Sequence, residues 1–266
     1  MDKLLIEGPT NLNGTVKVSR AKNAYLPILA AVLVSDKPIK LKNLPDLRDI
    51  RTMLRLLQNL GVKIDDHEDH TSFDASQLTG HEATYELVKT MRASIFVLGP
   101  LLARLGKAKV SLPGGCAIGT RPIDIHLKNL EKLGVEFEIS SGYVESKSSN
   151  LKACHLPLSF PSVGATENLM MASIFIDGET IIENAAREPE ISDLADFLNA
   201  MGASINGAGT SKITITGVKE LNAVEYEAIG DRIEAATYIF GALMTESEVK
   251  VEGMNPKHIG FVLDTL

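Results

Sequence analysis

The sequence has little cysteine, no long apolar run and no excess of basic charge. Only Cys116 and Cys154 are present, which is too few for a disulfide framework and favours a reducing, cytoplasmic location. The first nine residues contain no apolar run of signal-peptide length, and no segment approaches the roughly 20 apolar residues of a membrane span. The net charge of −7 argues against a nucleic-acid-binding protein but leaves small anionic substrates possible.

Several common site motifs are also missing. There is no phosphate-binding Walker loop, no dinucleotide fingerprint, no nucleophile-elbow serine and no zinc-ligand pair. His67-Glu68-Asp69-His70 is the best candidate for metal binding, but no third ligand is implied by the surrounding sequence. We therefore predict that no metal is bound.

A unit that occurs three times organises the chain. Each copy has a short strand, a loop with Asn or Gly, an amphipathic helix, a Leu-Gly or Met-Gly pair and a second strand. The predicted helices are 49–59, 123–132 and 191–200, and their closing glycines Gly61, Gly134 and Gly202 suit left-handed caps. Longer apolar helices are predicted over 24–33, 85–102 and 165–176, the last two in the centre of the fold.

A fourth copy starts at Val249, and Leu266 corresponds to a mid-helix position of the other copies. This predicts a chain that is C-terminally truncated relative to a longer parent protein, with an unusual natural terminus as the alternative. The composition, 44% apolar and 23% charged over 266 residues, is that of globular protein with one large domain or two small ones.

The loop Leu112-Pro113-Gly114-Gly115-Cys116 contains the most distinctive local feature. A cysteine between small residues on a loop is expected to be exposed, and Arg121 would favour its thiolate. The loop glycines would let backbone N–H groups approach an anion. A tight turn with an inert cysteine is the alternative; Cys154, in a strand-like segment, is assigned no role.

Two further segments, Lys22-Asn23 and Ser162 to Gly164, precede apolar helices, where an anion is favoured by the helix dipole, and Arg92 lies inside a third predicted helix. Lys22 and Asn23 could bind a phosphate or carboxylate, although taken alone a solvated lysine and a capping asparagine are the simpler interpretation. Arg92 needs a partner, either an internal carboxylate or a ligand phosphate. The small-residue loop Ser162-Val163-Gly164 suits a nucleotide phosphate.

Taken together, these segments resemble the UDP-N-acetylglucosamine enolpyruvyl transferases (1-carboxyvinyltransferases) over the whole chain. The motifs that carry the resemblance are Ala21-Lys22-Asn23-Ala24, Thr90-Met91-Arg92-Ala93-Ser94, Leu112 to Cys116, Arg121-Pro122-Ile123-Asp124, Ser162 to Asn168, Glu183 to Glu190 and Asp231-Arg232-Ile233-Glu234. The related shikimate-pathway transferase shares the fold but not this cysteine loop.

The resemblance implies an inside-out α/β barrel, a mixed α/β (α+β) fold of repeated βαβαββ units. Residues 21–229 would form a nearly complete domain, and residues 1–20 and 230–266 would be pieces of an incomplete second domain. The implied reaction transfers the enolpyruvyl group of phosphoenolpyruvate to the 3′-hydroxyl of UDP-N-acetylglucosamine, the first committed step of peptidoglycan synthesis, without metal or organic cofactor.

The resemblance also implies residue roles. Cys116 would be the proton donor, Lys22 and Asn23 would bind phosphoenolpyruvate, and the remaining matched positions would bind the UDP-sugar: Arg92, Arg121, Pro122, Ile123, Asp124, Ile125, Ser162, Val163 and Gly164. Arg20 stands where the family commonly has glycine, so we expect it either to crowd the hinge or the phosphate beside Lys22 or to cause backbone strain. A non-catalytic remnant or UDP-sugar-binding fragment is the alternative function.

Overall fold

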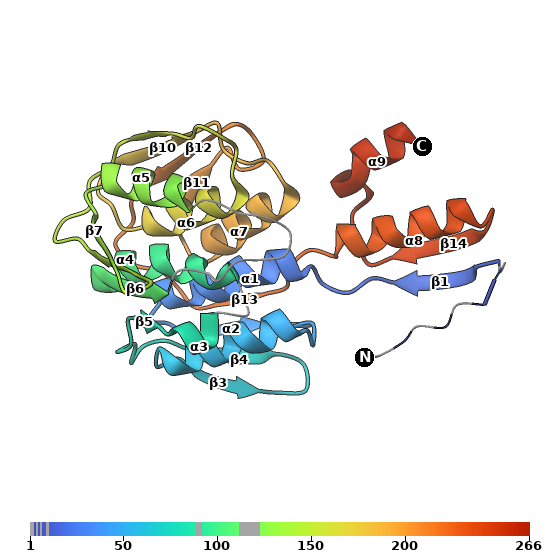
Figure 1. Ribbon diagram of the computed structural model, residues 1–266, viewed down its shortest axis with the longest axis horizontal. Coiled ribbons are helices and arrows are strands. Elements are labelled where there is room, and N and C mark those ends of the chain that lie inside the picture. Colours follow the sequence, from blue (N-terminus) through green and yellow to red (C-terminus); the bar gives the residue numbers. More distant parts are fainter. Residues whose placement is uncertain (1–2, 4, 6, 9–10, 89–91, 112–122) are drawn as a thin grey trace. The chain divides into compact units, whose positions relative to one another are not determined.

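The computed structural model describes residues 3, 5, 7–8, 11–88, 92–111 and 123–266 (Figure 1). The chain divides into two compact units. Unit 1 comprises residues 1–21 and 228–266, and unit 2 comprises residues 22–227. The predicted Cys116 site and the positions Arg121 and Pro122 lie outside the described residues.

Unit 2 contains three four-stranded sheets with one shared topology. In each, a short edge strand pairs in parallel with the second strand, and the next two strands are antiparallel. The sheets are, in order, β13 (Val224–Tyr226), β2 (Ile39–Leu41), β4 (Thr71–Asp74), β3 (Lys63–Asp66); β5 (Glu82–Ala83), β6 (Lys107–Ser111), β8 (Tyr143–Lys147), β7 (Glu136–Ser140); and β9 (His155–Pro157), β10 (Glu179–Glu183), β12 (Lys212–Thr216), β11 (Ser204–Asn206). This confirms the repeated unit.

The turns of the unit have matching backbone conformations. Asn43 and Asn184 follow the opening strands of the first and third copies, with φ of 50° and 56°. The closing glycines Gly61, Gly134 and Gly202 have φ of 102°, 100° and 102°, as predicted for a region that side chains rarely enter. Each position of the third copy lies 141 residues after its counterpart in the first, as Asn184 does after Asn43.

Three outer helices follow these turns: α2 (Arg48–Asn59), α5 (Asp124–Lys132) and α7 (Pro189–Ala200). Their bounds are within two residues of the predicted ranges. The apolar stripe of α2 is fully buried at Met53, Leu56 and Leu57. Burial of each such side chain contributes about 1.5–3 kcal/mol, so tertiary packing stabilises these helices.

Three helical segments fill the centre, with the strands outside them (Figure 1). These are α1 (Lys22–Ala31) with the 3₁₀ turn η1 (Val32–Val34), the 3₁₀ segment η2 (Arg92–Val97) with α4 (Leu98–Leu105), and α6 (Val163–Ala172). In α1 and α6 every residue from the third onward is buried. Each is apolar on most sides, which is typical of a helix enclosed by other elements.

The three central segments run in the same direction. α1 contacts η2 while η1 contacts α4, and Gly164 at the start of α6 faces Phe96. At Gly99 the helices approach so closely that an added Cβ would lie 2.3 Å from the backbone oxygen of Asn168. All three segments therefore begin at one end of unit 2.

The prediction of one continuous helix over 85–102 is wrong. The segment contains α3 (Tyr85–Val88), then η2 and α4, and residues 89–91 lie outside the described part. Pro100 explains the change to 3₁₀ geometry before α4, because it has no N–H for the carbonyl of Phe96. In the first turn of α4 that missing donor has no cost.

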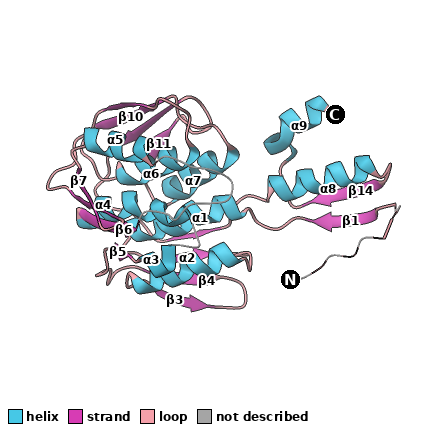
Figure 2. Ribbon diagram, viewed as in Figure 1, coloured by secondary structure: helices cyan, strands magenta, loops and turns pink. Residues whose placement is uncertain are grey.

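Unit 1 has the parallel pair β1 (Asn13–Lys17) and β14 (Glu248–Glu252), with α8 (Arg232–Met244), η3 (Pro256–Ile259) and α9 (Gly260–Thr265) (Figure 2). α8 is mostly apolar, yet only Ala235 and Ala242 are buried. Arg20 forms an antiparallel bridge with Gly230, and its φ is not positive. The expected backbone strain at Arg20 is therefore wrong.

Candidate active site

The starts of the three central segments define the candidate site. α1 begins at Lys22 and α6 at Val163, and the described part of η2 opens with Arg92, so three of the predicted anion-binding positions lie at the same end of unit 2. Helix N-termini present unpaired N–H groups and a partial positive charge. This end of the unit is therefore suited to anionic ligands. The side chain of Arg92 is outside the described part.

Lys22 is held by a carboxylate from an outer helix. Its Nζ lies 3.0 Å from Oδ2 of Asp49, in the first turn of α2, and both side chains are about one-third exposed, at 37% and 34%. Asn23 next to it is exposed. The sequence analysis did not assign Asp49, because only the packing of α1 on α2 brings it to Lys22.

Ser162 caps α6. Its Oγ accepts a hydrogen bond from the N–H of Ala165, at 3.3 Å, and its carbonyl accepts one from Oγ1 of Thr166. Capping leaves the first N–H groups of the helix, at Val163 and Gly164, without an intrahelical partner. These groups are the ones that would bind a phosphate.

The start of α5 lies beside the start of α6. Ile123 precedes α5, Asp124 and Ile125 begin it, and the ring of His126 lies against Gly164. Asp124 forms a helical ion pair with Lys128, at 3.1 Å. The structure therefore brings the predicted segments 123–125 and 162–164 together.

His126 and Asn168 form a buried polar pair that the sequence analysis missed. Nδ2 of Asn168 lies 3.2 Å from Nδ1 of His126, and burial lowers the pKa of His126 to about 4. The imidazole is therefore neutral at physiological pH. Asn168 ends the motif Ser162 to Asn168, but no sequence signal indicated that it pairs with His126.

Glu167, in α6, is a second buried titratable group, fully enclosed, and among the described residues neither of its carboxyl oxygens has a hydrogen-bond partner. Burial raises its pKa well above the usual value, and the nearby carboxyls of Glu190 and Glu188 raise it further. Both effects favour the protonated form of this carboxyl over the charged one.

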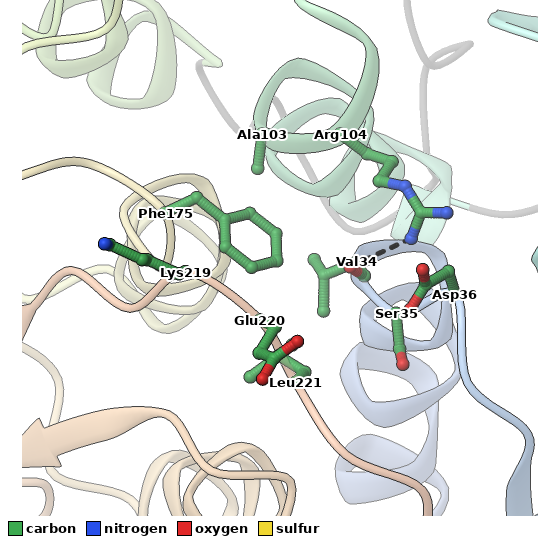
Figure 3. A pocket seen from close by; sticks show the side chains of 9 residues that line it. All are labelled: Val34, Ser35, Asp36, Ala103, Arg104, Phe175, Lys219, Glu220 and Leu221. Carbon is green, nitrogen blue, oxygen red and sulfur yellow. Dashed lines mark hydrogen bonds between the residues drawn. The ribbon is translucent and has the colours of Figure 1, made fainter.

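The opposite end of the central bundle has a pocket of about 240 Å³ (Figure 3). It lies at the C-terminal ends of the helices, where Arg104 donates to the carbonyl of Val34 at 3.2 Å and Phe175 lies beside Ala103. C-terminal helix ends favour cations, and Arg104 already meets this preference.

Among the residues that the structure describes, no three His, Cys, Asp or Glu side chains are grouped as metal ligands. His67 and His70 stack with ring centroids 4.6 Å apart, and Nδ1 of His70 bonds to Asp69. Within the same part of the chain, no helix is long and apolar enough to cross a membrane.

Comparison with known proteins gives the family. Residues 6–266 match the family model described as EPSP synthase (3-phosphoshikimate 1-carboxyvinyltransferase). The chain belongs to this family. The predicted fold class is thereby confirmed, as is the resemblance to enolpyruvyl transferases.

Among curated relatives, the chain is 53% identical over 259 residues to UDP-N-acetylglucosamine 1-carboxyvinyltransferase 2 of Carboxydothermus hydrogenoformans, covering 97% of the chain and 62% of that protein. It is also 53% identical over 264 residues to UDP-N-acetylglucosamine 1-carboxyvinyltransferase of Lawsonia intracellularis, covering 99% and 63%. The chain thus spans less than two thirds of the length of these relatives.

Solved structures support the fold. The enolpyruvyl transferase NikO from Streptomyces tendae superposes with a TM-score of 0.77 at 23% identity, covering 88% of this chain and 56% of that one. EPSP synthase from Acinetobacter baumannii superposes with a TM-score of 0.74 at 19% identity, covering 96% of this chain and 59% of that one. At these identities the likeness concerns the fold alone.

Proposed function

We propose that this chain acts as a UDP-N-acetylglucosamine 1-carboxyvinyltransferase, transferring the enolpyruvyl group of phosphoenolpyruvate to the 3′-hydroxyl of UDP-N-acetylglucosamine. The observation that carries the proposal is the identity of 50–53% to relatives of that name over nearly the whole chain. The 19% identity to a solved EPSP synthase provides no such argument for a shikimate substrate. A role in peptidoglycan synthesis and a cytoplasmic location are parts of the same proposal.

The geometry of unit 2 is consistent with two anionic substrates. Lys22, steadied by Asp49, and Asn23 would bind phosphoenolpyruvate at the start of α1. The capped start of α6 and the adjacent segment 123–125, together with Arg92, Arg121 and Pro122, would bind the UDP-sugar. Helix N-termini stabilise phosphate charge without a counter-ion that must itself be desolvated.

In the proposed reaction, the sugar hydroxyl gives its proton to a general base and its oxygen bonds to C2 of phosphoenolpyruvate, while C3 gains a proton from the thiol of Cys116. Loss of a C3 proton and of phosphate from C2 then restores the double bond in the enolpyruvyl ether. Positive charge near the phosphate stabilises the leaving group, which is the role of Lys22 in this scheme.

The test is phosphate release by the purified chain with phosphoenolpyruvate and either UDP-N-acetylglucosamine or shikimate 3-phosphate. We expect release only with the UDP-sugar, and its loss in Lys22→Ala. Release with shikimate 3-phosphate alone would contradict the proposed substrate. Binding of UDP-N-acetylglucosamine without phosphate release would instead favour a UDP-sugar-binding fragment. If the chain shows no binding of the UDP-sugar and no phosphate release, the proposal is overturned.

A further inference from the structure

The orientation of the Asn168 amide is fixed by two backbone groups. The N–H of Gly99 can only donate, and it bonds to Oδ1 of Asn168 at 2.5 Å. The carbonyl of Ile95 can only accept, and Nδ2 of Asn168 donates to it at 2.8 Å. Asn168 is fully buried, so water cannot substitute for either group.

The amide in turn fixes the tautomer of His126. The second hydrogen on Nδ2 of Asn168 points to Nδ1 of His126, 3.2 Å away, which must therefore accept. Because the ring is neutral, its single proton lies on Nε2. The exposed fraction of His126 is 7%, so its orientation is set by packing as well as by Asn168.

The Nε2 edge of the ring faces the start of α6. A Cβ added to Gly164 would lie 3.4 Å from Cε1 and 3.6 Å from Nε2 of His126. Glycine therefore leaves this edge uncovered at the helix end. Within the described part of the chain, no hydrogen-bond partner is found for Nε2.

We propose that His126 is a positioning residue for the UDP-sugar, donating a hydrogen bond from Nε2–H to a diphosphate oxygen held at the start of α6. The inference rests on the proposed function and adds a residue, with its tautomer set by Asn168, to the binding site. A neutral donor orients the oxygen without adding a charge, and it stays a donor across the physiological pH range because the ring does not titrate there.

The first experiment measures binding of UDP-N-acetylglucosamine to the full chain by titration calorimetry, for wild type, His126→Gln and His126→Phe. The glutamine amide can donate from a position near Nε2, whereas phenylalanine cannot. Phenylalanine also removes the acceptor for Asn168, whereas the glutamine amide oxygen can still accept, so the melting temperature of each variant is measured beside its Kd. We expect Kd to rise roughly 10- to 100-fold in His126→Phe, the range for a hydrogen bond to a charged group, and about threefold or less in His126→Gln.

The kinetic counterpart is the KM for each substrate. In His126→Phe the KM for the UDP-sugar should rise while the KM for phosphoenolpyruvate stays unchanged. Equal weakening of binding in both variants, or wild-type binding in His126→Phe, would overturn the role of His126. If wild type itself fails to bind the UDP-sugar, the proposed function falls and this inference with it.

A second measurement does not depend on the variants folding. Nitrogen-15 NMR of the wild-type chain should show a proton on Nε2 of His126 and none on Nδ1. Addition of UDP-N-acetylglucosamine should shift the Nε2–H resonance, as expected for a group that bonds the ligand. A proton on Nδ1, or a resonance that saturating ligand leaves in place, would overturn the inference.

Discussion

Nζ of Lys22 lies 3.0 Å from Oδ2 of Asp49, a residue 27 positions later in the sequence. The pair joins the start of a central helix to the first turn of an outer one. Because both side chains are partly exposed, the ion pair contributes little to stability, on the order of 0–1 kcal/mol. The effect of the ion pair is to hold the ammonium group of Lys22 at the end of unit 2 where the central helices begin.

Asp49→Asn should therefore weaken phosphoenolpyruvate use more than stability. We expect kcat/KM for phosphoenolpyruvate to fall about tenfold, equivalent to about 1.4 kcal/mol, because Lys22 loses its anchor. The matched control is Asp46→Asn, which removes an exposed ion pair with Arg51 near the start of the same helix. Steady-state phosphate release measures both; an equal effect in the two variants would contradict a specific role for Asp49.

Glu167→Gln should change how stability depends on pH. In the folded chain the pKa of Glu167 is raised above its model-peptide value of 4.5. The folded state then binds more protons than the unfolded state above that value, so stability falls as pH rises through the window between the two pKa values. Glutamine, which cannot ionise, should remove this part of the slope.

The measurement is the melting temperature of wild type and Glu167→Gln between pH 5 and pH 8. Glu131→Gln, at an exposed position of α5, is the control for loss of one carboxylate. Wild type and Glu167→Gln should differ most in melting temperature at high pH, where Glu167→Gln should be the more stable of the two. Parallel curves for wild type and Glu167→Gln would show that Glu167 stays charged or is solvated.

Gly99→Ala should loosen the contact between α4 and α6. An added Cβ would lie 2.3 Å from the backbone oxygen of Asn168, which cannot move independently of its helix. Overpacking of this kind costs about 1–3 kcal/mol. Gly241→Ala in α8 is the matched control, since its Cβ would meet only a Leu12 side-chain atom at 3.6 Å.

Hydrogen exchange with peptide-resolved mass spectrometry reports the effect locally. Peptides from α4 and α6 should exchange faster in Gly99→Ala than in wild type, and their exchange should be unchanged in Gly241→Ala. Gly241→Ala should be neutral or slightly stabilising, because alanine favours a helix over glycine. Unaltered protection of both peptides in Gly99→Ala would mean that the helices can separate without penalty.

The two cysteines should differ in reactivity. Partial burial raises the pKa of the Cys154 thiol, whose Sγ lies 3.5 Å from the carbonyl of Lys132. Less thiolate means slower alkylation. We expect an epoxide analogue of phosphoenolpyruvate, such as fosfomycin, to modify Cys116 and leave Cys154 unmodified.

Peptide mass mapping of the treated chain checks this directly. Cys154→Ser should be modified as fast as wild type, and Cys116→Ser should not be modified at all. Label on Cys154 with Cys116 untouched would refute the assignment of Cys116 as the reactive thiol.

The sequence alone was sufficient for the repeated unit and its outer helices. Apolar residues at helical spacing and the glycines at 61, 134 and 202 are local signals, and α2, α5 and α7 begin and end within two residues of the prediction. Local signals also placed Lys22 and Val163 at helix starts. The 3₁₀ segment η2 was missed, since the apolar pattern continues through it into α4.

Only the tertiary structure decided which residues meet. β13 joins the sheet of β2, pairing Val224 with Ile39 across most of the chain, and no local pattern specifies that partner. The same holds for Lys22 with Asp49 and for His126 with Asn168. Such contacts depend on which helices pack together and on how their side chains interdigitate. The apolar periodicity of the sequence predicts the buried face of each helix, but it does not specify which helix packs against that face.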